Sequence, residues 1–298
     1  MKGIANRPIV PLYRCCSEDS ERIDELIYGM EVIITEVSTE KISDLVEESL
    51  PESGQNITTD LWILVETEYF YRGYALRKDF LLEEDRSWDF AIWNSLEKKR
   101  VYQSNADVLS VPRIQGKILL EIPRGGVIGF QKDVPEAPGW IQVSMADGSI
   151  GYMKRKFAGE YVKKPVGTEE EIRKKVVETA ESYLGTQYRW GGKTPFGIDC
   201  SGLTSMSFLL NGILTYRDAE IKEGFSVKEI PFSERQQGDL LYFKGHIALL
   251  IDTERFIHST GRAGSDGVVI NSLNPEDDDY REDLAKGIQK TGSVFPLK

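Results

Sequence analysis

The sequence has few cysteines and few histidines. Three of its 298 residues are cysteines, and two of these, Cys15 and Cys16, are adjacent, so the sequence does not encode a disulfide-stabilised framework. Low cysteine usage of this kind is typical of a reducing compartment. The two histidines, His246 and His258, are the only side chains whose ordinary pKa lies near neutrality. Acid–base chemistry by imidazole is therefore confined to these two positions.

Long apolar runs and an excess of basic charge are also missing. Apolar runs such as 247–251 (IALLI) are far too short to cross a membrane. The net charge of −11 argues against nucleic acid or an anionic membrane as a partner, because binding to phosphates needs a basic surface. The first residues carry no apolar core of signal-peptide length, so we expect a cytoplasmic protein, or a secreted one if a leader has been removed.

The first two-thirds of the chain predicts β-structure. Segments 32–37 and 61–70 are rich in β-branched and aromatic residues, and the polar stretch 47–60 between them predicts a long surface loop. A second β block follows, in which residues 140–153 predict a hairpin that turns at Asp147-Gly148. Residues 86–104 show no clear period and are expected to connect the blocks. The predicted boundaries are 1–85, 86–104 and 105–162, followed by a C-terminal domain at 165–298.

The two β blocks share a coarse pattern. Each has a strand that begins with tryptophan, at Trp62 and at Trp140, and then a Gly-Tyr pair, at Gly73-Tyr74 and at Gly151-Tyr152. This order resembles bacterial SH3-like domains arranged in tandem. Two unrelated small β domains are the alternative.

The predicted secondary structure changes from strands to helices at about residue 165. Thr168 and Glu171 form a capping-box pattern, and the helical spacing that follows predicts a helix that stops at Gly185. Residues 201–212 predict a second helix. Short strands are then expected, at 238–243, 246–251, 255–259 and 268–273. Two helices followed by an antiparallel meander predict an α+β domain.

The third cysteine lies in the stretch YRWGGKTPFGIDCSGL at 188–203. Asp199 is a natural N-cap for the second helix, which leaves Cys200 in the first helical turn. The helix dipole and the unpaired N–H groups there favour a thiolate nucleophile. A small buried apolar residue is the alternative for Cys200, and core packing is expected for Trp190.

A cysteine nucleophile needs an imidazole base and a polar group that orients it. His246 and His258 are twelve residues apart, and a hairpin centred on Asp252 would place them directly opposite each other, with Cβ atoms about 5 Å apart. A zinc site that uses both histidines is the rival interpretation. The chain lacks the usual second cluster of metal ligands, so we expect no metal and no cofactor.

Taken together, these motifs resemble the NlpC/P60 peptidases, a papain-like family that cuts peptidoglycan peptides. The resemblance covers about 165–298 and implies Cys200 as nucleophile, His246 as general base and His258 as orienting residue. With two SH3-like barrels in front, the chain is similar to the γ-D-glutamyl-L-diamino acid endopeptidases of murein recycling. Gly245 stands where relatives often carry a further histidine.

The resemblance also implies a substrate. Enzymes of the recycling type accept murein tri- or tetrapeptides with a free N-terminal L-Ala and release L-Ala-γ-D-Glu. The third residue, diaminopimelate or L-Lys, stays open. Asp199 and Asp218 match acidic positions that would pair with the free ammonium. Asp199 could instead be only a helix cap, and Asp218 could pair only with Arg217.

Further contacts are expected around the nucleophile. Ser201 is expected to bind the α-carboxylate of D-Glu, the backbone N–H of Cys200 to serve the oxyanion, and the Tyr188 hydroxyl to assist there. The resemblance further implies that a tyrosine and a glutamate of the first SH3-like domain touch the amino end of the ligand. The candidates are Tyr71, Tyr74 and Glu31.

Three other functions compete with this one. A secreted general peptidoglycan hydrolase would use the same catalytic residues without selecting a free amine. A papain-like acyltransferase would use the same Cys-His pair on a thioester or a lipid. A wall-binding module without activity would not need Cys200, His246 and His258 intact.

Overall fold

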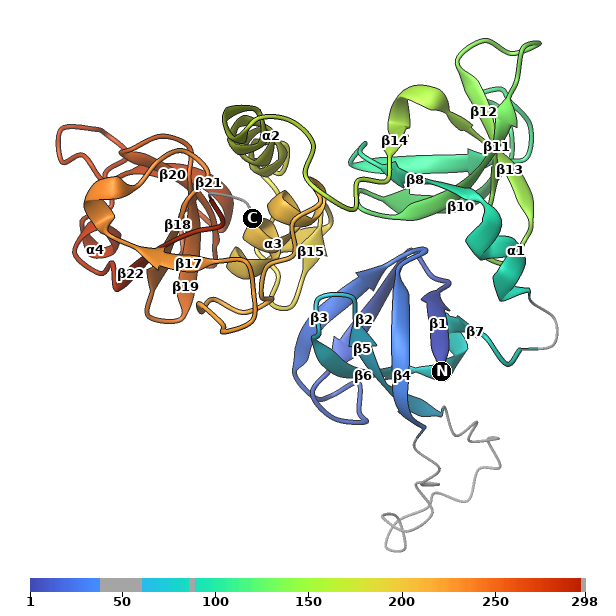
Figure 1. The fold of residues 1–298 in the computed structure, drawn as a ribbon, viewed down its shortest axis with the longest axis horizontal. Coiled ribbons are helices and arrows are strands. Elements are labelled where there is room, and N and C mark those ends of the chain that lie inside the picture. The colour runs from blue at the N-terminus through green and yellow to red at the C-terminus, as the bar shows by residue number, and fades with distance from the viewer. Residues whose placement is uncertain (38–60, 86–88, 296–298) are drawn as a thin grey trace, which may run out of the picture.

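The computed structural model describes residues 1–37, 61–85 and 89–295, which form three compact domains (Figure 1). Two N-terminal domains, called domain 1 and domain 2 below, are small antiparallel β-barrels of the SH3-like type. The C-terminal domain combines helices with a larger sheet, so the α+β class is confirmed. The loop expected at 47–60 lies outside the described residues.

Domain 1 is a seven-stranded sheet in the order β3-β2-β6-β5-β4-β1-β7. Its strands are β1 (Lys2–Ala5), β2 (Ile9–Tyr13), β3 (Arg22–Ile27), β4 (Glu31–Val37), β5 (Trp62–Thr67), β6 (Arg72–Leu76) and β7 (Phe80–Leu82). A single 3-10 turn, η2 (Arg77–Asp79), precedes β7.

Domain 2 repeats this arrangement in the order β10-β9-β13-β12-β11-β8-β14. Its strands are β8 (Glu97–Val101), β9 (Asn105–Leu109), β10 (Ile118–Pro123), β11 (Val127–Asp133), β12 (Trp140–Ser144), β13 (Ile150–Lys154) and β14 (Ala158–Glu160), and η3 (Arg155–Phe157) precedes β14. Replacing each strand of domain 1 by the strand seven places later reproduces the order of domain 2. The two domains are therefore a structural repeat.

The segment 86–104, expected as a connector, is only partly one. It contains a short helix, α1 (Phe90–Ser95), and then β8, which pairs with both β11 and β14. The second sheet thus begins eight residues before the predicted boundary at 105. The alternating burial that marks most strands is weak in β8 because its first residues are charged.

Packing explains the repeated Trp and Gly-Tyr signals. Trp62 and Trp140 open β5 and β12, and both are nearly buried. A Cβ on Gly73 would lie 2.9 Å from the Leu12 side chain, and a Cβ on Gly151 would lie 2.3 Å from Val108. In each barrel the glycine is required where β6 or β13 crosses closely over the neighbouring strand.

The C-terminal domain places two helices against a six-stranded sheet in the order β17-β22-β18-β19-β20-β21. Its elements are α2 (Glu169–Glu181), β15 (Lys193–Thr194), β16 (Gly197–Ile198), α3 (Cys200–Leu209), β17 (Lys228–Ile230), η4 (Phe232–Glu234), β18 (Leu240–Phe243), β19 (His246–Leu250), β20 (Arg255–Thr260), β21 (Gly267–Ser272), α4 (Glu282–Ala285) and β22 (Lys290–Ser293). Helix α3 packs on β19 and β20.

The ends of α2 confirm one prediction and correct another. Thr168 and Glu171 form the expected capping box. The helix ends at Glu181 with Ser182 as its C-cap, so Gly185 does not stop the helix. Gly185 has φ +79°, and it turns the chain in the loop that follows. No described helix is long and apolar enough to cross a membrane.

The hairpin of β19 and β20 differs in register from the prediction. Leu249 pairs with Ile257 and Leu250 with Phe256, so the hairpin is centred on Thr253 and not on Asp252. The Asp252 side chain holds the turn in this register by accepting bonds from the N–H groups of Glu254 and Arg255. His246 and His258 are consequently diagonal neighbours on one face of the sheet.

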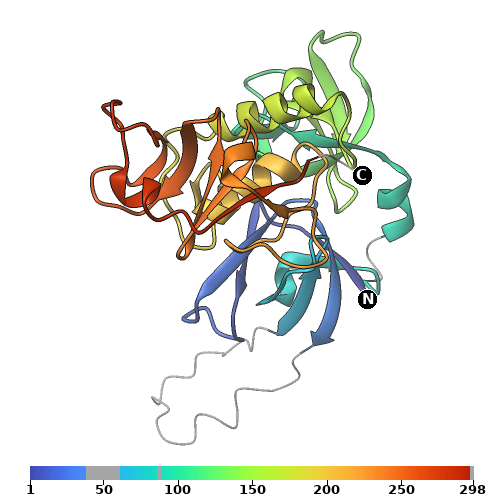
Figure 2. The same cartoon turned by 60° about the vertical axis from the view of Figure 1, so that its left-hand side comes forward.

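Domain 1 is joined to the C-terminal domain by continuous apolar packing. Leu26 and Ile27 of β3 belong to the same buried cluster as Met206 and Leu210 at the end of α3. Figure 2 shows domain 1 lying directly below the helices of the C-terminal domain. The strand β3 is therefore fixed beside the helix that begins at Cys200.

Candidate active site

Cys200 is the first residue of α3, as predicted. Asp199 is the N-cap, and its Oδ1 accepts the N–H of Gly202 at 2.6 Å. The first turn therefore has a satisfied cap and presents the cysteine side chain at the helix end. The thiol is buried, yet it lines a cavity of about 360 Å³ between domain 1 and the C-terminal domain.

Cys200 carries a protonated thiol near pH 7. Burial and the charge of Asp199 raise the pKa of Cys200 to about 11, against the opposing effects of the Ile247 N–H, Arg217 and the Ser201 N–H. The expectation that the helix start alone favours a thiolate is thus wrong, because desolvation outweighs the helix dipole here. The proton of Cys200 needs an acceptor.

The two histidines are bonded to each other, and His258 is bonded in turn to Asn271. The His246 Nε2 and His258 Nδ1 atoms are 2.8 Å apart, and His258 Nε2 lies 2.9 Å from Oδ1 of Asn271. Asn271 donates its amide N–H₂ to the carbonyl of Asp279, which fixes Oδ1 as the acceptor. His258 therefore donates from Nε2, accepts at Nδ1 from His246, and leaves Nδ1 of His246 unprotonated.

The electrostatics of the pair agree with this tautomer. Burial lowers the pKa of His246 to about 3 and that of His258 to about 4. Both rings are neutral near pH 7, so the unprotonated Nδ1 of His246 can accept a proton. Asn271 was missed by the sequence analysis, because an asparagine on an edge strand carries no distinctive local signal.

The cavity beside Cys200 is built by both domains. Tyr71 comes from domain 1 and donates its O–H to Oδ1 of Asp218 at 3.0 Å. Tyr188 and Ser201 also line the cavity. Burial raises the pKa of Asp218, and burial raises the pKa of Tyr188 well above its usual value, so Tyr188 is a hydroxyl donor. The full lining comprises Arg14, Glu21, Ile23, Tyr71, Tyr188, Trp190, Asp199, Cys200, Ser201, Arg217, Asp218, Ala219, Glu220 and Gly245.

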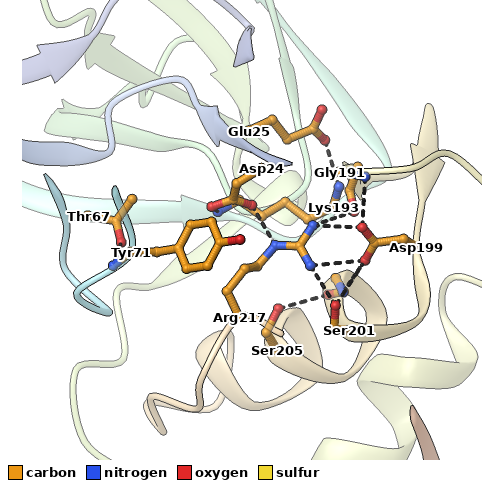
Figure 3. A network of polar contacts seen from close by, with 12 residues as sticks. Asp24, Glu25, Thr67, Tyr71, Gly191, Lys193, Asp199, Ser201, Ser205 and Arg217 are labelled. Carbon is orange, nitrogen blue, oxygen red and sulfur yellow. Dashed lines mark hydrogen bonds and ion pairs between the residues drawn. The ribbon is translucent and has the colours of Figure 1, made fainter. Parts of the chain in front are cut away.

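Asp199 lines the cavity, but its carboxylate is already occupied. Arg217 donates to Oδ1 at 3.0 Å and to Oδ2 at 2.9 Å, Gly191 N–H donates to Oδ2 at 2.8 Å, and Gly202 N–H supplies the cap bond (Figure 3). The Ser201 hydroxyl adds a longer bond to Oδ1 at 3.4 Å, so the predicted pairing of Asp199 with a substrate ammonium competes with five existing bonds. Arg217 binds Asp199 and Asp24, which leaves Asp218 free of the pairing with Arg217 considered for it.

Two of the predicted contacts from domain 1 lie elsewhere. Glu31 begins β4 opposite Ile4 and is not part of the cavity lining. Tyr74 pairs with Leu64 inside the sheet and is likewise outside the lining. The error has one cause: neighbouring residues of a strand face opposite sides, and the sequence does not say which side faces the C-terminal domain.

Other cavity residues were not predicted. Trp190 is 59% exposed and donates its indole N–H to Glu21 at 3.0 Å, so the expectation of core packing is wrong. Glu21 also accepts from Arg14 at 2.7 Å. These three residues span the mouth of the cavity from domain 1 to the C-terminal domain. Among the residues that the structure describes, no group of three or more metal-ligating side chains could hold an ion.

Comparison with known proteins agrees with this geometry. The NlpC/P60 family model matches residues 185–279, which contain Cys200, His246, His258 and Asn271. Dipeptidyl-peptidase 6 from Lysinibacillus sphaericus is 36% identical over 299 residues, which cover 99% of this chain and 100% of that protein. The chain belongs to the NlpC/P60 family.

One further relative and one solved structure are also similar to this chain. Gamma-D-glutamyl-L-lysine dipeptidyl-peptidase from Bacillus subtilis (strain 168) is 34% identical over 111 residues, which cover 33% of this chain and 36% of that protein. The crystal structure of an NlpC/P60 family protein from Bacillus cereus ATCC 10987 has a TM-score of 0.75 with 18% identity, and it covers 99% of this chain and 100% of that one. This likeness extends the shared fold to all three domains. The NlpC/P60 domain is thus a peptidase domain with SH3-like barrels in front of it.

Proposed function

We propose that the protein is a cysteine endopeptidase that hydrolyses the γ-D-glutamyl-L-diamino acid bond of murein peptides with a free N-terminal L-Ala. The observation that carries this proposal is the contact between Tyr71 and Asp218, made inside the cavity that domain 1 closes beside Cys200. A cavity closed on one side accepts a short chain end. A half-buried carboxylate in it suits an ammonium group.

The names of the relatives support the same class. A protein similar over its whole length is a dipeptidyl-peptidase, and another is named for the γ-D-glutamyl-L-lysine bond. An enzyme that removes a dipeptide has to bind a chain end two residues from the cut. The cavity, with domain 1 as one wall and Asp218 in its lining, supports such a binding mode.

The geometry favours Asp218 over Asp199 as the partner of the ammonium. Asp199 is saturated by Arg217 and backbone N–H groups, whereas Asp218 accepts from the hydroxyls of Tyr71 and Tyr216 and still retains acceptor capacity. Ser201 Oγ accepts from Arg217 at 2.7 Å, and its distance to Asp199 Oδ1 is a long 3.4 Å. Its O–H donates to Asp199 only through this long bond and can be redirected to the α-carboxylate of D-Glu.

The reaction would follow the acyl-enzyme route. His246 Nδ1 takes the proton of Cys200, and the thiolate attacks the γ-carbonyl carbon of D-Glu. The backbone N–H of Cys200 and the Tyr188 O–H would stabilise the oxyanion. The imidazolium of His246 then protonates the leaving amine of the diamino acid. Water, deprotonated by His246, hydrolyses the thioester and releases L-Ala-γ-D-Glu.

The test is incubation of the protein with L-Ala-γ-D-Glu-diaminopimelate and with the L-Lys analogue. Release of L-Ala-γ-D-Glu that alkylation of Cys200 abolishes supports the proposal, and the faster peptide identifies the preferred third residue. Acyl transfer to an added amine without hydrolysis would instead favour the acyltransferase. Absence of turnover on both peptides would reject the proposal.

We also propose a cytoplasmic role in recycling. Murein peptides acquire a free L-Ala amine only after the sugar has been removed, so a site selective for that amine acts late in wall degradation. Cell fractionation tests the location. Protein found outside the cell would favour a secreted hydrolase instead.

A further inference from the structure

A buried acid of domain 1 is bonded to an arginine that in turn binds both neighbours of Cys200. Asp24 in β3 is fully buried, and its Oδ1 accepts from Arg217 Nε at 2.6 Å. Arg217 is itself 1% exposed, and its other N–H groups bind both oxygens of Asp199 and the Ser201 hydroxyl (Figure 3). One guanidinium thus connects domain 1 to both residues that flank Cys200.

The arrangement is one of balanced charges. The second oxygen of Asp24 lies 3.3 Å from Nζ of Lys193, which is also buried. If the charge of Asp24 were removed, Lys193 would lose this carboxylate. Arg217 would then keep Asp199 as its remaining anionic partner. Because a buried charge without its partner is strongly disfavoured, Arg217 would shift and would carry Asp199 and Ser201 with it.

Comparison of the two barrels shows that the fold does not require an acidic residue at the position of Asp24. Asp24 pairs with Leu12 in domain 1, and Leu120 pairs with Val108 in domain 2, with a register shift at the same next position in both sheets. Leu120 is therefore the counterpart of Asp24. The barrel forms with leucine at this position in the domain that supplies none of the cavity lining.

We infer that Asp24 is a positioning residue for the peptidase reaction, acting through Arg217 to hold Asp199 and Ser201 in place beside Cys200. The inference rests on the proposed function for its kinetic test. It adds a specific reason why catalysis in the C-terminal domain depends on domain 1. Arg217 transmits the effect and does not itself touch the thiol in this account.

The kinetic test is a double-mutant cycle on the full chain. Asp24→Asn should lower kcat/KM for the free tripeptide roughly tenfold or more, since a buried charge-assisted hydrogen bond is lost. If Asp24 acts through Ser201, Ser201→Ala should cost less in the Asp24→Asn background than in the wild type. Additive effects would overturn the inference. Should Asp24→Asn fail to fold, Asp24→Leu replaces it in the same cycle, following Leu120.

Glu25→Gln is the matched control for the cycle. Glu25 is the next residue of β3, is fully buried, and accepts from the backbone N–H of Lys193 at 2.8 Å without a bond to Arg217. Its substitution disturbs the same domain contact, so its effect should add to that of Ser201→Ala. Equal coupling of Glu25 and Asp24 to Ser201 would assign the effect to the interface in general and would overturn the specific role.

A second measurement does not need the substrate. The pH profile of Cys200 alkylation by iodoacetamide is followed by peptide mapping, because Cys15 and Cys16 are exposed and also react. The thiol is faced by Asp199, Arg217, Tyr188 and the N–H groups of Ile247 and Ser201, and His246 is its proposed proton acceptor. Arg217→Gln leaves Asp199 without its counter-charge and should move the profile to higher pH. Asp24→Asn removes a negative charge and should move it to lower pH.

The inference predicts that the pH profiles of Arg217→Gln and Asp24→Asn shift in opposite directions, because the two substitutions remove charges of opposite sign. A general loosening of the site would expose the thiol in both variants and would move both profiles in the same direction, which would overturn the inference. Opposite shifts in a protein that fails to cleave either tripeptide would retain the positioning role and reject the proposed function. The two claims are therefore separable.

Discussion

Domains 1 and 2 have the same strand order, yet only domain 1 contributes side chains to the cavity that Cys200 lines. In β3 of domain 1 the register positions of Arg22 and Asp24 correspond to Ile118 and Leu120 in β10 of domain 2. Tyr71, which precedes β6, corresponds to Ser149, which precedes β13. A few side chains on one strand and one turn thus convert a common barrel into one wall of an active site.

The comparison also shows what is shared. Both barrels keep a buried tryptophan at the start of the fifth strand and a glycine at the close crossing of the sixth. These features maintain the fold and are present in both copies. The charged and hydroxyl-bearing differences therefore serve the contact with the C-terminal domain, and paired substitutions in the two copies can test this.

The largest effect is expected from substitution of the proposed nucleophile, and the residual turnover of this variant is the background against which the other variants are measured. Cys200→Ala should reduce turnover to the background level, because no other described thiol lines the cavity. His246→Ala should be nearly as severe, whereas His258→Gln should be milder because an orienting group can be partly replaced. Activity assays with unfolding midpoints as folding controls check this. Substantial turnover by Cys200→Ala would contradict the account.

The next effect concerns the acid that Tyr71 contacts. Asp218→Asn should lower kcat/KM for a free-amine tripeptide by roughly 100-fold, corresponding to about 3 kcal/mol for a half-buried charge pair. It should change the slow rate on the N-acetylated peptide much less. Steady-state kinetics on both peptides measure the difference. Equal losses on the two peptides would assign Asp218 a structural role.

An exchange between the two barrels sharpens the comparison directly. Asp24→Leu gives domain 1 the residue of domain 2 and should lower kcat/KM about tenfold or more. Leu120→Asp makes the reverse change in domain 2 and should leave kcat/KM unchanged while lowering the unfolding midpoint. Kinetics and thermal unfolding of both variants form the test. A comparable loss of activity in Leu120→Asp would contradict the proposal that domain 1, and not domain 2, supports the active site.

The smallest effect is a shift in pH dependence. Asp218 must be ionised to bind an ammonium, and burial raises its pKa, so kcat/KM should fall as the pH drops through that raised pKa. The hydrogen bond from Tyr71 opposes the shift, so Tyr71→Phe should move the acid limb to higher pH. Tyr152→Phe, which loses only a bond to Gln142 in domain 2, should leave the limb in place. An acid limb unmoved in Tyr71→Phe would contradict the assignment.

The sequence predicted the parts that depend on local chemistry. The capping box at Thr168, the N-cap at Asp199 and the position of Cys200 at the helix start follow from residue types at short spacing. The tandem barrels follow from a pattern that occurs twice. Each of these signals lies within one element or one repeat.

The parts that depend on contact between domains could not be predicted in the same way. Asp24 and Glu25 form an acidic pair in a strand whose other residues, apart from Arg22, are apolar, and this was the available signal for a buried partner. Their partners, Arg217 and Lys193, lie more than 160 residues away. The choice of Glu31 and Tyr74 failed because the facing side of a strand is set by tertiary contact. The raised pKa of Cys200 follows from burial, which a helix position alone does not give.

The central claim is that domain 1 and Asp218 together select a free amino end. Its most direct test compares kcat/KM for L-Ala-γ-D-Glu-diaminopimelate with that for the same tripeptide acetylated on L-Ala, using the wild-type chain. The account predicts that acetylation lowers kcat/KM by roughly 100-fold or more, because the carboxylate of Asp218 would stay without its cation. Equal rates on the two peptides, or efficient digestion of intact sacculi, would contradict it.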